Sequence, residues 1–317
     1  MKEIDLVVTY LDDSVENWRK DFNKRQRKEI GYGVQNIANR QAFGMERIRN
    51  WDTLKYFLRG VEANLDFVRN VIIVVYDEEQ IPKWINQECD NLRIVYHKDF
   101  MPEDILPQFN GIAVKFYVSN IDGLSDKYIM CDDDYYFINK VDRSMFFKEN
   151  KTVQIDSTLP YKPFDEWYLK GSDWVFYSML NNNFEFERHY YSENKTKYWI
   201  SHLPEARDRL MEQKLIKEHY LLFKEPFKNS RFRHKNQYTT DLFTDILRIK
   251  GDCILSNDFK NKCKYVTLKS DVDFNQFKDY CIVCFNDTEQ LDNFSITKEK
   301  LIKFLESKLP NKSKFEK

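Results

Sequence analysis

Four short apolar runs lie in the first 140 residues of the chain, and charged side chains follow each of them directly. The expected strands are residues 4–9, 71–76, 92–96 and 128–131. They are rich in β-branched and aromatic residues and almost continuously apolar, which is typical of strands buried on both faces of a parallel sheet. Helical patterns separate them. The sequence therefore predicts an α/β fold with a Rossmann-like, mostly parallel sheet.

The clearest helical pattern between these strands begins near residue 51. Trp51, Leu54, Leu58 and Val61 fall on one stripe, and Asn50 is available as the N-cap. A second helix is expected after Asn110.

The charged side chains fall where an open α/β sheet binds ligands, at the carboxyl ends of its strands. They are Asp12 and Asp13, Asp77 to Glu79, His97 and Asp99, and Asp132 to Asp134. Acids after a strand can simply solvate a turn. Four coincident clusters instead favour a metal-assisted or phosphate-handling site, because consecutive carboxylates such as Asp132 to Asp134 supply the oxygen ligands that magnesium or manganese prefers.

The rest of the chain has a different residue pattern. Aromatic residues make up 16% of the sequence and are dense between 153 and 199, which predicts an irregular, aromatic-rich insertion or lid with short strands. Helices are expected at 204–223, at 240–249 before Gly251, and at 297–309.

Two further groups of residues could carry chemistry. If Arg231-Phe232-Arg233 is extended, both guanidinium groups share one face and form a paired phosphate clamp. The alternatives are a surface strand or a nucleic-acid patch. His202 stands before an expected helix and could act as a base, although a lone histidine is more often structural.

Composition excludes several classes. The formal net charge of −1 argues against a nucleic-acid-binding protein. No apolar run is long enough to cross a membrane, and the amino terminus does not read as a signal peptide, so we expect a cytoplasmic protein with reduced cysteines. Cys281 and Cys284 could bind zinc with Cys253 and Cys263, but a buried strand at 280–285 is the favoured interpretation.

An ordered series of short motifs resembles the Stealth proteins, the sugar-1-phosphate transferases of bacterial capsule and exopolysaccharide synthesis. This family includes the catalytic subunit of the N-acetylglucosamine-1-phosphotransferase. The motifs that carry the resemblance are residues 4–12, 47–50, 54–56, 58–62, 80–84, 97–99, 106–107, 109–110 and 123–125, then Asp133-Asp134, His202, Pro204, residues 231–233, 284–287 and the tail 309–316. The resemblance thus covers nearly the whole chain.

The chain departs from the family pattern at several of these places. Where the family usually has Asn, an acid, Trp, Gly, Ser and Glu, this chain has Asp132, Asn50, Tyr10, Asp13, Gly111 and Lys115. We expect Lys115 to contact a phosphate or a sugar carboxylate, the alternative being that it points to solvent. We also expect Asp132→Asn to be mild.

The resemblance implies a single Stealth-type catalytic domain over 1–317, with a glycosyltransferase-like nucleotide-sugar fold. Its parts would be a nucleotide-sugar-binding half at 1–150, the insertion at 151–200 and a helical half at 201–317 that completes the site. The implied reaction transfers a hexose-1-phosphate from a nucleotide-sugar, typically a UDP-sugar, to a glycan hydroxyl and releases UMP. The alternatives are a glycosyltransferase that releases UDP and a non-catalytic glycan-binding protein.

The resemblance also implies roles for individual residues. The expected catalytic residues are Asp133, Asp134, His202, Arg231 and Arg233, with His202 as base and the arginines on the phosphate. Magnesium or manganese would be bound by Asp134, Asp287 and Asn286. The donor would contact Thr9, Tyr10, Asp12, Asp13, Arg49, Asn110 and Lys115. The expected partners are a nucleotide-sugar, a glycan acceptor and membrane-bound capsule machinery that the protein meets peripherally at the inner face, but no nucleic acid.

Overall fold

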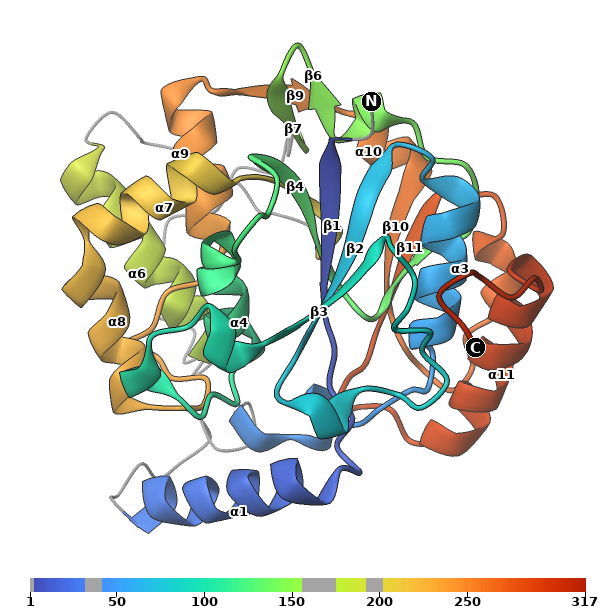
Figure 1. The fold of residues 1–317 in the computed structure, drawn as a ribbon, viewed down its shortest axis with the longest axis horizontal. Helices are drawn as coiled ribbons and strands as arrows, with labels where there is room; N and C mark the ends of the chain where they lie inside the picture. Colours follow the sequence, from blue (N-terminus) through green and yellow to red (C-terminus); the bar gives the residue numbers. More distant parts are fainter. Residues whose placement is uncertain (1–2, 32–41, 156–174, 192–201) are drawn as a thin grey trace.

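A five-stranded sheet with the strand order β3-β2-β1-β4-β8 forms the centre of the protein (Figure 1). The computed structural model describes residues 3–31, 42–155, 175–191 and 202–317. The strands are β1 (Ile4–Thr9), β2 (Val68–Val75), β3 (Leu92–Tyr96), β4 (Lys127–Asp132) and β8 (Glu205–Asp208). The first four run parallel, and β8 is antiparallel to β4. The predicted α/β class with a mostly parallel sheet is confirmed.

Helices cover both faces of this sheet, because alternate side chains of each buried strand point to opposite sides. Leu6 and Val8 of β1 belong to the same core cluster as α3 (Leu54–Asn64). Val7 instead belongs to the cluster of α4 (Gly111–Tyr117). Figure 1 shows these two helices on opposite sides of β1.

The predicted start of α3 is wrong. The N-cap is Thr53, and Trp51 lies before the helix. The side chain of Asn50 accepts a hydrogen bond from the backbone N–H of Asp52 at 2.8 Å, and Asp52 has a left-handed φ of 56°. This local turn competes with helix formation, so the chain becomes helical three residues later than the pattern suggested.

Two small sheets flank the central one. One has the order β10-β11-β5, with β10 (Cys263–Thr267), β11 (Ile282–Asn286) and β5 (Tyr135–Phe137). The other has the order β6-β7-β9, with β6 (Phe147–Lys148), β7 (Lys151–Ile155) and β9 (Cys253–Ser256). The predicted strand around Cys284 is confirmed as β11. Its antiparallel pairing with β5 sets Cys284 opposite Tyr135, next to the carboxylates that follow β4.

The predicted helix 204–223 is wrong at its start. The chain forms β8 first, followed by α7 (Arg209–Glu218) and α8 (Tyr220–Asn229). Arg207 is fully buried and forms ion pairs with Glu212 at 2.6 Å and with Glu205 at 2.9 Å. Pairing with the edge of β4 together with this buried ion pair stabilises a strand where the local pattern favoured a helix.

The later helices match the prediction more closely. Helix α9 (Asp241–Lys250) ends at Gly251, which has a left-handed φ of 68°. Helix α11 (Phe294–Lys308) starts three residues earlier than expected, because Asn293 caps it. The remaining elements are α1 (Glu16–Gly31), α6 (Val175–Tyr190), α10 (Asp258–Lys262) and the 3-10 turns η1 (Met45–Arg47), η2 (Glu78–Gln80), η3 (His97–Asp99), η4 (Glu103–Ile105), η5 (Val118–Asn120), η6 (Arg143–Met145) and η7 (Phe274–Phe277).

The expected irregular insertion contains regular structure. Strand β7 lies at its start, and α6 is a helix of 16 residues whose buried side chains include Val175 and Met179. Residues 156–174 and 192–200 of this stretch lie outside the described residues.

Candidate active site

The carboxyl ends of β1 and β4 meet at the centre of the candidate site. Thr9 is the register partner of Asp132, and its hydroxyl donates a hydrogen bond to Asp132 Oδ1 at 3.1 Å. The central strands β1 and β4 therefore place two of the predicted site residues in direct contact, at the sheet edge where parallel α/β proteins bind ligands.

Lys115 is the ion-pair partner of Asp132. Its ammonium nitrogen lies 2.8 Å from Asp132 Oδ2, and the two side chains are only 16% and 18% exposed. Burial alone would raise the pKa of the Asp132 carboxyl group, but the positive charges of Lys115 and His202 outweigh it and lower the pKa to about 2. Lys115 does not point to solvent, so that alternative is wrong. Its contact with a ligand stays a prediction.

Five of the six positions at which the chain departs from the family pattern form two contact groups, and Gly111 belongs to neither. Lys115 and Asp132 form one such group. In a second group, Asn50 donates through its side chain to the Tyr10 hydroxyl at 3.0 Å and through its backbone N–H to Asp13 at 3.1 Å. The residues of the first group thus neutralise each other's charge, and those of the second group satisfy each other's hydrogen bonds.

The Lys115–Asp132 contact changes the expected effect of Asp132→Asn. The amide would leave a poorly exposed ammonium group without its counter-charge, so the single variant should be clearly less stable than the wild type. Adding Lys115→Met should recover part of the loss. Urea unfolding of both single variants and the double variant should give a coupling energy of about 0.5 to 3 kcal/mol. Strictly additive effects would show that the ion pair has no energetic role.

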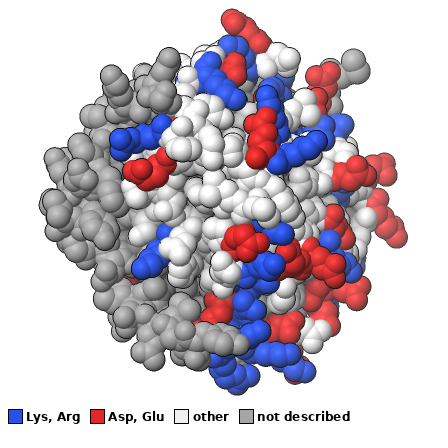
Figure 2. All heavy atoms as spheres, turned by 90° about the vertical axis from the view of Figure 1, so that its left-hand side faces the viewer, with Lys and Arg blue, Asp and Glu red and all other residues white. Residues whose placement is uncertain are grey.

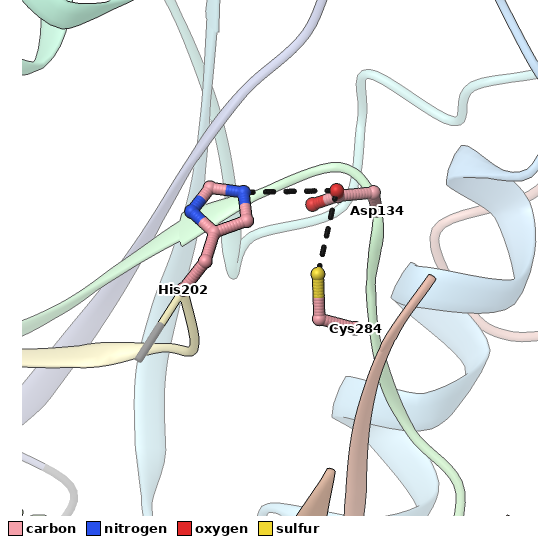
Figure 3. A group of neighbouring side chains, drawn as sticks. All are labelled: Asp134, His202 and Cys284. Atoms are coloured by element: carbon pink, nitrogen blue, oxygen red, sulfur yellow. Dashed lines mark hydrogen bonds and ion pairs between the residues drawn. The ribbon is translucent and has the colours of Figure 1, made fainter. Parts of the chain in front are cut away.

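Asp134, His202 and Cys284 form a second cluster beside Asp132 (Figure 3). Asp134 follows β4, His202 precedes β8 and Cys284 lies in β11. The His202 Nε2 atom is 3.7 Å from Asp134 Oδ2, and the Cys284 thiol donates to the same oxygen at 3.4 Å. The other ring nitrogen, His202 Nδ1, is hydrogen-bonded to the Tyr135 hydroxyl at 3.1 Å.

The electrostatics of this cluster follow from burial and neighbouring charge. Burial would lower the pKa of the His202 imidazole, but the hydrogen bond and charge of Asp134, with the charge of Asp132, raise it above its ordinary value. Burial and the like charges of Asp134 and Asp132 raise the pKa of the Asp133 carboxyl group well above its usual range. Burial and Asp134 also raise the pKa of the Cys284 thiol.

These residues fit a divalent cation at Asp134. Its Oδ1 atom is buried and has no hydrogen-bond partner among the described residues. The mutual repulsion of three consecutive carboxylates would be relieved by positive charge. His202 lies beside this carboxylate, with its Nε2 atom 3.7 Å from Asp134 Oδ2. The raised pKa of Cys284 keeps its sulfur protonated, so it is a hydrogen-bond donor to Asp134 rather than a thiolate ligand.

Asp287, the second predicted metal ligand, lies outside this cluster. Arg49 forms a two-pronged ion pair with its carboxylate, and the Trp51 indole donates to it at 3.0 Å. Asn286 ends β11, and its side chain donates to the backbone carbonyl of Asp287 at 2.9 Å. The structure therefore pairs Arg49 with Asp287. The sequence analysis had predicted that Arg49 contacts the nucleotide-sugar and that Asp287 binds the metal.

Asp12 and Asn110 serve the local backbone. The Asp12 carboxylate accepts from the backbone and hydroxyl of Ser14 at 2.9 and 2.7 Å. Asn110 is buried, caps α4 through Ile112, and donates to Gln237 at 2.9 Å. Both positions therefore shape the loops at the sheet edge, which leaves their predicted contact with a donor untested.

Arg231 is not placed as half of a phosphate clamp. The segment is not a strand, and the Arg231 side chain donates to the backbone carbonyls of Phe227, Lys228 and Asp104 at 2.9, 2.6 and 2.7 Å. Its backbone N–H donates to Glu29 at 2.8 Å. Arg231 is a buried structural residue that ties three segments together.

Arg233, in contrast, is half-buried and has no ion pair or hydrogen bond among the residues that the structure describes. Its guanidinium carbon lies 5.8 Å from the centroid of the Phe176 ring. Burial and the positive charge of Arg47 lower the pKa of Arg233 to about 9, against the opposing effect of Asp132. Arg47 itself forms an ion pair with Glu46 at 3.7 Å.

The sequence interpretation missed Arg47, Tyr135 and Glu205. Arg47 stood in a quoted motif, but nothing local distinguished it from Arg49. Tyr135 follows Asp134 directly in the sequence, so its position near the carboxylates could be predicted. Its contact with His202 could not. Glu205 is a charged neighbour of Lys115 and is anchored by Arg207.

Fold and site together define an α/β protein with a carboxylate and histidine cluster at the carboxyl edge of a parallel sheet. Residues 47–155 match the family model described as Stealth protein CR2, conserved region 2. The resemblance of this chain to the Stealth proteins is confirmed.

Relatives match along the whole chain. The capsular polysaccharide phosphotransferase WcwK of Streptococcus pneumoniae is 26% identical, over 100% of this chain and 99% of the relative. The exopolysaccharide phosphotransferase cps2G of Lactiplantibacillus plantarum is 27% identical, over 99% and 96%. These names confirm the expected enzyme class, which is a phosphotransferase of polysaccharide synthesis. Among solved structures, the galactosyltransferase LgtC with donor and acceptor sugar analogs aligns over 98% of each chain, at 10% identity and a TM-score of 0.44.

Within the described parts of the chain, no helix combines the length and apolarity needed to cross a bilayer.

Proposed function

We propose that this protein transfers a hexose-1-phosphate from a nucleotide-sugar, most simply a UDP-sugar, to a hydroxyl group of a glycan. The acceptor oxygen attacks the phosphorus next to the sugar, and the bond from that phosphorus to the UMP oxygen breaks. The products are a phosphodiester between sugar and acceptor and free UMP. The relatives' names support the reaction class, and the donor and leaving group are part of the proposal.

The observation that carries this proposal is the Arg233 guanidinium, which no described residue pairs with and which is influenced by the charge of Asp132. A half-buried cation without a carboxylate partner is costly unless an anion binds to it. Arg47 contributes a second positive charge nearby, in the role that the sequence had given to Arg231. A transferred phosphate, which gains negative charge in the transition state, is the substrate group that suits two guanidinium groups.

His202 is the residue best placed to accept the proton of the acceptor hydroxyl. Its Nδ1 atom is held by Tyr135, so Nε2 faces the Asp132 and Asp134 carboxylates, and those charges stabilise the imidazolium that forms. Asp132 is oriented by Thr9 and Lys115, which keeps this carboxylate fixed beside the ring.

Asp134 would hold magnesium or manganese, with His202 adjacent. When bound, such a cation neutralises negative charge on the departing nucleotide. The same cation would offset the like charges of Asp134 and Asp132 that raise the pKa of the neighbouring Asp133 carboxyl group.

The nucleotide that is released tests the proposal against an ordinary glycosyltransferase. With donor and acceptor present, we expect UMP to appear in step with a phosphodiester product, because the phosphate travels with the sugar. Separation of the nucleotides by chromatography, with phosphorus NMR of the product, measures both. Release of UDP would establish the glycosyltransferase alternative.

A glycan-binding protein without activity is the second alternative. It would bind saccharides but consume no donor. A panel of UDP-, GDP- and CMP-sugars with divalent cation therefore separates it from either enzyme, and the same panel identifies the donor.

A further inference from the structure

Helix α1 presents an uninterrupted basic face beside the candidate active site. Lys20, Lys24, Arg27 and Lys28 are all exposed, and their spacing of three and four residues places them on one side of the helix. We call these four residues the basic stripe. Among the described residues, none of the four has an ion pair or a hydrogen bond. The nearest acids on the helix are Glu16, one turn before Lys20, and Asp21, which lies three residues before Lys24 and accepts a hydrogen bond from the Tyr76 hydroxyl at 2.8 Å.

The opposite face of α1 fixes the helix to the walls of the site. Trp18 and Phe22 are buried against Phe109 and Phe232, with ring centroids 6.0 Å apart for Trp18–Phe109 and 5.2 Å apart for Phe22–Phe232. Phe232 directly precedes Arg233. The basic stripe is therefore held in a fixed position relative to the proposed phosphate-binding arginine.

Polar contacts at both ends of α1 strengthen this attachment. Near its start, Arg19 forms an ion pair with Asp13, which follows β1. Near its end, Glu29 is buried and accepts hydrogen bonds from the Ser230 hydroxyl at 2.7 Å and from the Arg231 backbone at 2.8 Å. Figure 1 shows α1 below the carboxyl ends of the central strands, and blue side chains gather along the lower edge of the face in Figure 2.

We propose that the basic stripe binds the acceptor, and that the acceptor is a saccharide chain already carrying phosphodiester groups. This inference rests on the proposed function, which makes phosphodiesters as its product. Each transfer adds one negative charge to the chain, so a growing product is a polyanion that complements a row of cations. The four positions span roughly 12 Å along the helix, from the rise of about 1.5 Å per residue, which suits an extended chain lying along α1 towards the site.

A membrane surface fits this face less well. The exposed side chains of the stripe are all charged, while Trp18 and Phe22 of α1 point inward against the site. Interfacial helices instead bury an apolar face in the lipid boundary. The saccharide is therefore the partner that the arrangement favours.

Binding measurements with a charge-neutralised helix test this proposal. The variant combines Lys20→Gln, Lys24→Gln, Arg27→Gln and Lys28→Gln, since glutamine keeps helix propensity. The probe is an oligosaccharide linked by phosphodiesters, compared with a neutral dextran oligosaccharide of the same length. We expect the variant to bind the charged probe at least about tenfold more weakly at low salt, with the wild-type affinity also falling as salt rises.

A matched variant controls for net charge. Lys262, Lys264, Lys303 and Lys312 are exposed lysines outside α1, and their replacement by glutamine also removes four positive charges. This control should bind the charged probe like the wild type. Both variants should turn over donor with a small neutral acceptor at the wild-type rate.

The outcomes separate the two proposals. Equal loss of binding in both variants, or no preference for the charged probe, would overturn the role of the basic stripe while wild-type turnover still supports the function. Stripe-dependent binding to phosphatidylglycerol vesicles but not to the charged saccharide would show a membrane site and also overturn it. Absence of donor consumption by the wild type would reject the proposed function itself.

Discussion

Asp134→Asn should lower turnover at least about 10²-fold, the scale of losing a preorganised charged group at a reacting centre. The substitution keeps the shape of the side chain but removes its charge. Asp134 Oδ2 is the oxygen that both His202 and Cys284 approach, and Oδ1 is buried with no partner in the described parts of the chain. The variant should also lose the response to magnesium or manganese, measured as initial rates during titration with each cation.

Direct binding of manganese, followed by electron paramagnetic resonance, separates a lost cation site from a damaged fold. Asp126→Asn is a suitable control, because Asp126 precedes β4 at the opposite end of the strand and is 59% exposed. It should leave both rate and manganese binding unchanged. Full wild-type activity in excess chelator would contradict the assignment of a cation to Asp134.

The central sheet was predictable because its signal is local. Strands buried on both faces require nearly continuous apolar runs, and β1 and β3 have the predicted bounds. In a parallel sheet the residues after such strands must gather at one edge. The proximity of Thr9 and the carboxylates after β4 followed from that rule, and the structure shows Thr9 bonded to Asp132.

The sequence failed where contacts between distant segments decide the local structure. Residues 205–208 form a strand because they pair with β4 and bury Arg207 against Glu212, and neither contact is visible in a helical pattern. Likewise, Cys284 was known as a strand residue, but only the pairing of β11 with β5 brings it to Asp134. Side-chain roles at a site depend on such long-range pairings.

The two arginines around Phe232 illustrate the same limit with opposite outcomes. Alternation along an extended segment would give Arg231 and Arg233 one shared role. The segment is not a strand, so the two side chains have separate surroundings. Arg231 donates to three backbone carbonyls, whereas Arg233 has no ion pair or hydrogen bond with any residue that the structure describes and is influenced by the charges of Arg47 and Asp132.

Lysine substitutions should therefore affect stability at one position and turnover at the other. Arg231→Lys keeps the charge but cannot reach three carbonyls at once, so we expect a loss of roughly 2 kcal/mol or more in the free energy of unfolding, since hydrogen bonds to charged groups contribute about 1.5 to 3 kcal/mol each. Arg233→Lys should fold normally but slow turnover about 10²-fold, because an ammonium group lacks the fork that grips a phosphate. Thermal unfolding of both variants measures the loss of stability, and steady-state kinetics measures the loss of turnover. An Arg233→Lys protein that loses stability while keeping its rate would make Arg233 structural and remove the main support for a transferred phosphate.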